Sequence, residues 1–345
     1  MRAIRLHETG GPDVLRLDEI PTPEPGPGQI LIKAHSIGTG IPDQLVRTGR
    51  YPWMPALPTI PGIEISGTVA ALGSEVTGLK EGDRVFGSAI QNRSCYAEYV
   101  ALDHEWVFPL ADGINLSDAG CLQNYRVAWC ILHEAVRLRE GDTAAIVGAS
   151  GGVGNALLQL AHAAGATTIA LTRTETKAAF IADQGADHII NTGRDHLSDR
   201  IKDITDGQGV DLFIDPVAGL AFKDHLDLLA PLGTLVLYGM IEDLPTNGVF
   251  EAQCARWGRS PAVRLFSIHA YDDQPAASAE HLAKLMDLMK SKKIEPAIHA
   301  ELPLELAGEA HRLIDSASVM GKILLQPDRT EASWRSGVDS RDHTD

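Results

Sequence analysis

The stretch that most constrains the fold is residues 142–173, which read DTAAIVGASGGVGNALLQLAHAAGATTIALTR. The apolar run at 144–147 has no polar alternation, which is typical of a strand buried on both faces of a parallel sheet. Four glycines follow between positions 148 and 154, and apolar residues then recur at helical spacing until Gly165. A second apolar run at 167–172 completes a βαβ unit of about 30 residues.

The glycines in this unit predict a phosphate-binding turn. Without a Cβ, the backbone can turn tightly and come close to a pyrophosphate, and the helix that follows offers unpaired N–H groups and the positive end of its dipole. An ordinary strand-to-helix turn without a ligand is the alternative, but it needs fewer glycines. We therefore predict a dinucleotide at Ser150, Gly151, Gly152, Val153 and Gly154.

The end of the second strand predicts which dinucleotide binds. Sites for NAD usually carry Asp or Glu about 20 residues past the glycines, whereas NADP sites carry Arg there. This chain has Thr172 and Arg173, with Lys177 one helical turn later. A guanidinium fork and a lysine ammonium both suit a phosphate, so we predict NADPH. The alternative is that both cations are solvated surface charges, and the intervening Glu175 is an acidic residue that complicates the assignment of NADPH over NADH.

Composition narrows the classes of partner. The chain has 345 residues, 44% of them hydrophobic and 22% charged, which is typical of a globular protein with two domains. Its formal net charge of −16 argues against nucleic acid, because phosphate backbones require a basic face. The longest uncharged apolar stretch, residues 228–241, contains Pro231 and two glycines and is too short for a membrane span.

The remaining composition predicts a cytoplasmic protein. The first residues, MRAIRLHETGG, contain no apolar core of a secretory signal. The four cysteines have no paired spacing, so they indicate a reduced compartment and no zinc-finger pattern.

The pattern of elements changes at about residue 122. Residues 1–121 contain short alternating strands and many turns, which predicts a β-rich domain. Residues 122–268 alternate strand and helix, which predicts an α/β domain with a doubly wound parallel sheet. We expect a strand at 95–100 and helices at 125–138 and 220–229. We further expect an irregular segment from about 240 to 260, an apolar strand at 263–268, helices at 279–290 and 305–315, and a last strand at 321–326. Residues 328–345 are polar without periodicity, which predicts a disordered tail.

Three segments resemble the medium-chain dehydrogenase/reductase superfamily. They are PGIEISGTVAALGSEVTGLKEGDRV at 61–85, REGDTAAIVGASGGVGNALLQLA at 139–161 and GKILL at 321–325. The resemblance implies a GroES-like catalytic domain made of residues 1–121 and 269–327, with a Rossmann NADPH-binding domain at 122–268 inserted between them. It also implies an active site in the cleft between the domains.

The resemblance further implies that this chain lacks the catalytic zinc of the superfamily's alcohol dehydrogenases. The positions that match their first-domain Cys and His are Gly40 and Ile63, and neither side chain can bind a metal. A four-cysteine lobe is also missing near residues 91–94. We therefore predict no metal site, and zinc analysis of the purified protein tests this.

The zinc-lacking members that this chain resembles are quinone oxidoreductases and 2-enoyl thioester reductases. Without a metal to polarise a ketone, an activated double bond or a quinone is the better hydride acceptor. The motif GRYP at 49–52 resembles the loop that carries the enoyl reductases' active-site tyrosine, so Tyr51 is a candidate proton donor or orienting group. Asn124 resembles a second polar contact. The alternatives are that Tyr51 only packs on Trp53 and that Asn124 is a helix N-cap.

The fold and the resemblance imply further contacts and a second copy of the chain. The expected cofactor contacts at the later strand ends and near the carboxyl end are Val217, Tyr238, Gly239, Met240 and Lys322. A surface lysine is the alternative for Lys322. In similar proteins the strand at 263–268 pairs across a two-fold axis, which predicts a homodimer. An NADPH-binding protein without catalytic activity, acting in a structural or regulatory role, is the alternative function.

Overall fold

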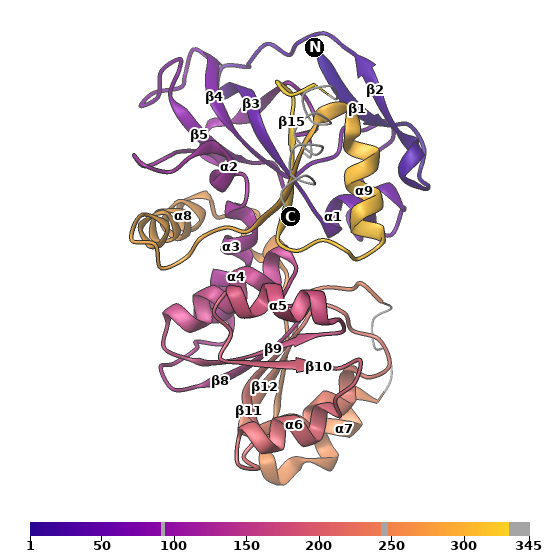
Figure 1. The fold of residues 1–345 in the computed structure, drawn as a ribbon. Helices are drawn as coiled ribbons and strands as arrows, with labels where there is room; N and C mark the ends of the chain where they lie inside the picture. The colour runs from indigo at the N-terminus through magenta and orange to yellow at the C-terminus, as the bar shows by residue number, and fades with distance from the viewer. Residues whose placement is uncertain (91–93, 243–247, 331–345) are drawn as a thin grey trace, which may run out of the picture. The chain divides into compact units, whose positions relative to one another are not determined.

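The computed structural model describes residues 1–90, 94–242 and 248–330. The chain divides into two compact units (Figure 1). The first contains Met1–Gln123, Tyr271–Lys290 and Pro296–Asp345, and the second contains Asn124–Ala270 and Ser291–Glu295. The predicted tail at 328–345 lies outside the described residues from position 331 onward.

The second unit is built on a six-stranded parallel sheet with the order β10-β9-β8-β11-β12-β13. In chain order this is 3-2-1-4-5-6, the doubly wound arrangement in which ligands bind at the carboxyl ends of the strands. The predicted α/β class is therefore confirmed. The strands are β8 (Thr143–Val147), β9 (Thr167–Thr172), β10 (His188–Asn191), β11 (Val210–Asp215), β12 (Leu229–Leu237) and β13 (Ala262–Leu265).

Helices flank this sheet because their apolar positions repeat at helical spacing. The helix α4 (Gly152–Ala163) buries Leu157, Leu158 and Leu160, and Ile201 of α6 (Leu197–Ile204) joins the core beneath β10 and β11. The other helical segments are α3 (Leu122–Trp129), η3 (Cys130–Ala135), α5 (Glu175–Asp183), η4 (Phe222–Leu228), α7 (Val249–Ala255) and η5 (Trp257–Arg259).

The first unit is a β-rich domain with a separate core. Its seven-stranded sheet has the order β14-β15-β3-β4-β5-β7, with β6 also paired to β3, and a two-stranded sheet joins β1 to β2. The strands are β1 (Arg2–Leu6), β2 (Leu15–Glu19), β3 (Gln29–Thr39), β4 (Glu64–Leu72), β5 (Arg84–Ser88), β6 (Tyr99–Asp103), β7 (Val107–Pro109), β14 (Ile298–Pro303) and β15 (Lys322–Gln326). The helices are η1 (Pro12–Val14), α1 (Ile41–Arg47), η2 (His104–Trp106), α2 (Leu116–Ala119), α8 (Pro275–Lys290), η7 (Leu304–Leu306) and α9 (Ala307–Asp315), and η6 (Ile268–Tyr271) lies where the chain returns to this unit.

Four local expectations were wrong. The segment predicted to be irregular contains α7, and the helix predicted at 220–229 is the 3₁₀ segment η4 followed by the start of β12. The predicted single helix at 125–138 ends as the π-helix η3, and the strand predicted at 95–100 begins only at Tyr99. The 3₁₀ and π segments use backbone hydrogen-bond spacings that residue periodicity does not distinguish from the α-helix.

A buried polar group in the first unit makes stability depend on pH. His311 of α9 is fully buried, and its Nε2 lies 3.2 Å from the Tyr96 hydroxyl. Burial, and then the nearby Arg47 guanidinium, lower the pKa of His311 to about 3. The unfolded chain, with a histidine pKa of about 6.5, therefore binds a proton that the folded chain excludes between these two values.

We expect this group to destabilise the fold as the pH falls below about 6.5. The His311 contribution alone should lower the free energy of unfolding by about 2 kcal/mol between pH 7.5 and pH 5.0. Urea unfolding of wild type and His311→Gln at both pH values measures the effect, because the variant has no proton to gain. Equal losses in the two proteins would contradict the assignment.

Candidate functional site

The glycine turn after β8 has the close approach that a dinucleotide-binding turn requires. Gly148 has φ of +67°, and its carbonyl accepts a hydrogen bond of 2.9 Å from the Gly151 N–H. A Cβ on Gly154 would lie 2.1 Å from the same carbonyl oxygen. Only glycine at position 154 therefore allows α4 to begin against this turn, with its first N–H groups at the carboxyl end of β8.

The ends of three neighbouring strands converge at this turn. Pro216 follows β11, and a Cβ on Gly239 would lie 2.5 Å from the Pro216 carbonyl oxygen, while one on Gly148 would lie 3.8 Å from the Pro216 ring. The buried Asp215 carboxylate accepts hydrogen bonds from the N–H groups of Val217 (2.6 Å) and Ala218 (3.3 Å). The predicted contacts Val217, Tyr238 and Gly239 thus lie at adjacent strand ends of one sheet edge.

Two cations lie where β9 meets α5. Arg173 follows β9 and is exposed, and Lys177 is half-buried in the first turn of α5. Burial, and then the Arg173 guanidinium, lower the pKa of Lys177. A nearby anion would act against both causes and raise this pKa, because it favours the charged form of the lysine. The two residues form what we call the cation pair, and the position suits a phosphate.

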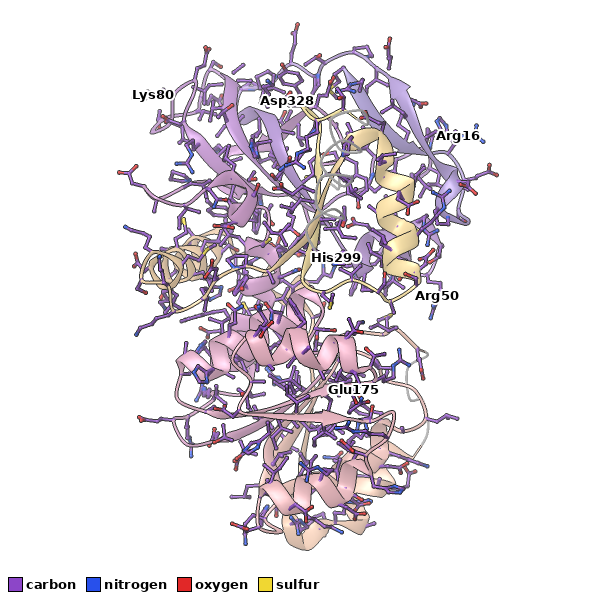
Figure 2. All side chains as sticks on the ribbon, in the orientation of Figure 1. Arg16, Arg50, Lys80, Glu175, His299 and Asp328 are labelled. Atoms are coloured by element: carbon purple, nitrogen blue, oxygen red, sulfur yellow. The ribbon has the colours of Figure 1, made fainter. Side chains whose placement is uncertain are left out.

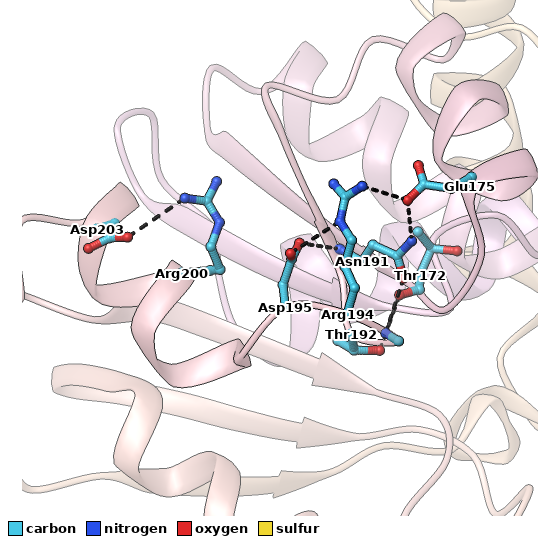
Figure 3. Close-up of polar contacts among 9 residues, drawn as sticks. Thr172, Glu175, Asn191, Thr192, Arg194, Asp195, Arg200 and Asp203 are labelled. Atoms are coloured by element: carbon cyan, nitrogen blue, oxygen red, sulfur yellow. Dashed lines mark hydrogen bonds and ion pairs between the residues drawn. The ribbon is translucent and has the colours of Figure 1, made fainter.

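Glu175 turns toward a different loop. Figure 3 shows its carboxylate meeting Asn191, the last residue of β10, and Arg194, which follows that strand. Its Oε1 accepts a hydrogen bond of 2.9 Å from Asn191 Nδ2 and one of 2.7 Å from Arg194 Nη1. Glu175 itself is the first residue of α5 and lies on the surface of the second unit (Figure 2). Sequence reasoning named Glu175 as a complication but missed the two residues that hold it.

In the first unit, Tyr51 lies on the loop after α1. The N–H groups of Arg50 and Tyr51 both donate to the Leu45 carbonyl, at 2.8 and 3.1 Å, which fixes the start of the loop; Arg50 is labelled in Figure 2. The Tyr51 and Trp53 rings lie 5.6 Å apart at a 58° tilt. Asp43 of α1 accepts hydrogen bonds from the Gly40 N–H (2.9 Å) and the Gly62 N–H (3.1 Å), which closes the loop.

The first unit also contains a buried ion pair at the carboxyl-terminal strand. The ammonium of Lys322, the first residue of β15, bonds to Oε1 of Glu64, the first residue of β4. Their side chains are 6% and 1% exposed, so both charges are removed from water. Glu64 Oε2 also accepts from the Gln123 N–H at 3.1 Å. Lys322 is thus no surface lysine, and its predicted cofactor contact stays a prediction.

No candidate metal centre is found among the residues that the structure describes. Gly40 and Ile63, the positions that match zinc ligands elsewhere, have no metal-binding side chains, and no three His, Cys, Asp or Glu residues in the described ranges cluster as ligands.

Asn124 is the third residue of α3, so it is not the N-cap of that helix. An open pocket of about 730 Å³ in the first unit, lined in part by His35, Arg84 and Ser117, contains none of the predicted site residues.

Known protein families match both units. Residues 26–130 match the alcohol dehydrogenase GroES-like domain, and residues 152–261 match the zinc-binding dehydrogenase family. In the described part of the chain, no helix is both long enough and apolar enough to cross a membrane.

Individual relatives match nearly the whole chain. Rat quinone oxidoreductase is 31% identical over 328 residues, which cover 94% of this chain and 97% of the relative. The human synaptic vesicle membrane protein VAT-1 homolog-like is 31% identical over 96% of this chain and 82% of its own length. The structure of Escherichia coli quinone oxidoreductase complexed with NADPH has a TM-score of 0.89 at 27% identity, covering 95% of this chain and all of that one. The chain therefore belongs to the medium-chain dehydrogenase/reductase superfamily, in its quinone oxidoreductase branch.

Proposed function

We propose that this protein is an NADPH-dependent oxidoreductase that transfers hydride to a quinone or to the activated C=C bond of an enone or enoyl thioester without zinc. The observation that supports the cofactor most directly is the cation pair Arg173 and Lys177 beside the glycine turn. The E. coli and rat relatives, named as quinone oxidoreductases, support the reaction class. When bound, the nicotinamide supplies the hydride, and a proton must reach the substrate separately.

The residues of the chain fit this cofactor. The glycine turn and the N-terminal N–H groups of α4 bind the pyrophosphate, and Arg173 and Lys177 bind the 2′-phosphate. The strand ends at Val217 and at Tyr238, Gly239 and Met240 position the nicotinamide. Ser150, Gly151, Gly152, Val153 and Thr172 complete the dinucleotide contacts.

The cofactor assignment predicts a selective loss on removal of Arg173. The variant Arg173→Ala should bind NADPH at least about tenfold more weakly, because it lacks a charge-assisted bond to the 2′-phosphate. Its affinity for NADH should stay within about twofold of wild type, because NADH has no such phosphate. Fluorescence titration with both nucleotides measures the two affinities. Unchanged NADPH affinity would reject the assignment.

Tyr51 is proposed as the catalytic proton donor or orienting group, and Asn124 as a second polar contact. A phenol is protonated at neutral pH and can donate to an oxygen on which negative charge forms. Removing the hydroxyl should therefore lower kcat at least about tenfold on the best substrate while leaving NADPH affinity unchanged. The comparison is Tyr51→Phe against wild type with quinones, enones and enoyl-CoA, followed at the nicotinamide absorbance. Equal turnover would refute the role of Tyr51.

A second candidate function is an NADPH-binding protein without catalytic activity. The observation that favours it is the similarity to a relative named as a synaptic vesicle membrane protein rather than as an enzyme. The same substrate panel discriminates the two functions. Binding of NADPH with no oxidation on any substrate class would favour the second.

We also propose a homodimer and a cytoplasmic location. Among the described strands, β13 is at the edge of the second unit's sheet, and its Leu265 is 71% exposed. An apolar strand with unpaired backbone groups at a sheet edge is a template for pairing with a second copy. Light scattering of the purified protein distinguishes a dimer from a monomer.

A further inference from the structure

The loop at residues 191–195, which begins with the last residue of β10, packs against the backbone of Thr172 and Arg173. The Thr192 N–H and hydroxyl both donate to the Thr172 carbonyl, at 2.8 and 3.1 Å (Figure 3). A Cβ on Gly193 would lie 2.7 Å from the Arg173 carbonyl oxygen. The glycine lets this loop lie directly on the backbone of Arg173, so the loop is part of the phosphate site's surroundings.

The loop is internally fixed around Asn191. This residue is 6% exposed, its Oδ1 accepts from the Gly193 N–H at 3.0 Å, and its N–H donates to Asp195 Oδ2 at 3.2 Å. The N–H groups of Arg194 and Asp195 both donate to the Asn191 carbonyl, at 3.0 and 2.8 Å. The other polar group of the Asn191 side chain, Nδ2, donates the hydrogen bond to Glu175.

The loop holds the one carboxylate that lies in sequence between Arg173 and Lys177. Arg194 bonds Glu175 through Nη1 at 2.7 Å and Asp195 through Nε at 3.2 Å, so one guanidinium binds both carboxylates. Among the described residues, no ion pair joins Glu175 to Arg173, so this carboxylate does not offset the Arg173 charge.

We infer that Arg194, assisted by Asn191, is a positioning residue that determines specificity for the 2′-phosphorylated dinucleotide. It holds the Glu175 carboxylate on the loop and offsets its charge. A released carboxylate at the first position of α5 would repel a 2′-phosphate, and could instead accept a hydrogen bond from a free ribose 2′-hydroxyl. This inference rests on the proposed use of NADPH.

The test measures binding of two ligand fragments by calorimetry. Adenosine 2′,5′-bisphosphate carries the 2′-phosphate, and 5′-ADP does not. In Arg194→Ala the affinity for the 2′,5′-bisphosphate should fall about fivefold, the effect of a solvent-exposed ion pair, while 5′-ADP affinity stays within about twofold. The double variant Arg194→Ala, Glu175→Gln should regain the wild-type preference, because its residue 175 has no charge to restrain.

Arg200→Ala is the matched control. Arg200 lies on α6 and pairs with Asp203 at 3.7 Å, as the dashed line in Figure 3 marks. Its removal therefore deletes one arginine charge from the same unit without removing a partner of Glu175. Its fragment affinities should equal those of wild type.

The possible outcomes distinguish a failure of the proposed NADPH specificity from a failure of the proposed role of Arg194. Wild type that binds both fragments equally would reject NADPH as the cofactor. A wild-type preference that Arg194→Ala retains would overturn the role of Arg194. A loss that Glu175→Gln does not restore would show that Arg194 acts through its own charge, which also overturns the restraint of Glu175.

Discussion

Replacing Lys322 with methionine is expected to lower the free energy of unfolding by about 3 to 5 kcal/mol, the usual cost of breaking a buried ion pair from one side. Glu64 is 1% exposed and, among the residues that the structure describes, would keep the Gln123 N–H at 3.1 Å as its hydrogen-bond partner. A Cβ on Gly38 would overlap the Glu64 side chain, so the carboxylate is closely packed against β3 on that side. Urea unfolding at pH 7.5 followed by circular dichroism measures the loss.

Two comparisons make the Lys322 result specific. The double variant Glu64→Gln, Lys322→Met removes both charges and leaves an acceptor for the Gln123 N–H, so it should recover most of the stability. Lys284→Met removes a lysine from an exposed i,i+4 pair with Glu280 on α8, and should change stability by less than about 0.5 kcal/mol. Equal losses of unfolding free energy for the two lysine substitutions would show that breaking the buried pair costs no more than breaking an exposed pair.

The variant Gly154→Ala is expected to abolish dinucleotide binding, with at least about a hundredfold loss of NADPH affinity, and to destabilise the second unit by about 1 to 3 kcal/mol. The added methyl carbon would lie 2.1 Å from the Gly148 carbonyl oxygen and 2.9 Å from the Ala149 Cα. Both contacts are with backbone atoms, so α4 and the turn must separate. Calorimetric titration and urea unfolding without ligand measure the two losses.

The variant Gly151→Ala distinguishes a glycine that ligand binding requires from a glycine that folding requires. A Cβ at position 151 would meet the Gly148 carbonyl oxygen at 3.5 Å, an ordinary contact, and Gly151 has an extended backbone with φ of −81°. This variant should keep wild-type stability and lose only affinity for the dinucleotide, whose pyrophosphate needs the open backbone. If Gly154→Ala were as stable as Gly151→Ala, the close approach of α4 would not be the reason for glycine at position 154.

The sequence predicted the sheet and its ligand edge because those depend on local, periodic signals. Continuous apolar runs separated by helical spacing predict a parallel sheet, and glycines between a strand and a helix indicate a phosphate turn. Sequence reasoning failed where backbone spacing changes without a change in periodicity, as in η3 and η4. It also missed α7, which follows the left-handed Gly248.

What the sequence by itself determined is therefore the fold class and the family, while the phosphate site at Arg173 and Lys177 stays a prediction. Only the tertiary structure decided where each charge goes. It pairs Lys322 with Glu64 across 258 positions, and it turns Glu175 onto Asn191 and Arg194, 16 and 19 positions away. The physical reason is that apolar periodicity depends on residues that are close in sequence. The partner of a charged side chain depends instead on which distant segments the fold brings together.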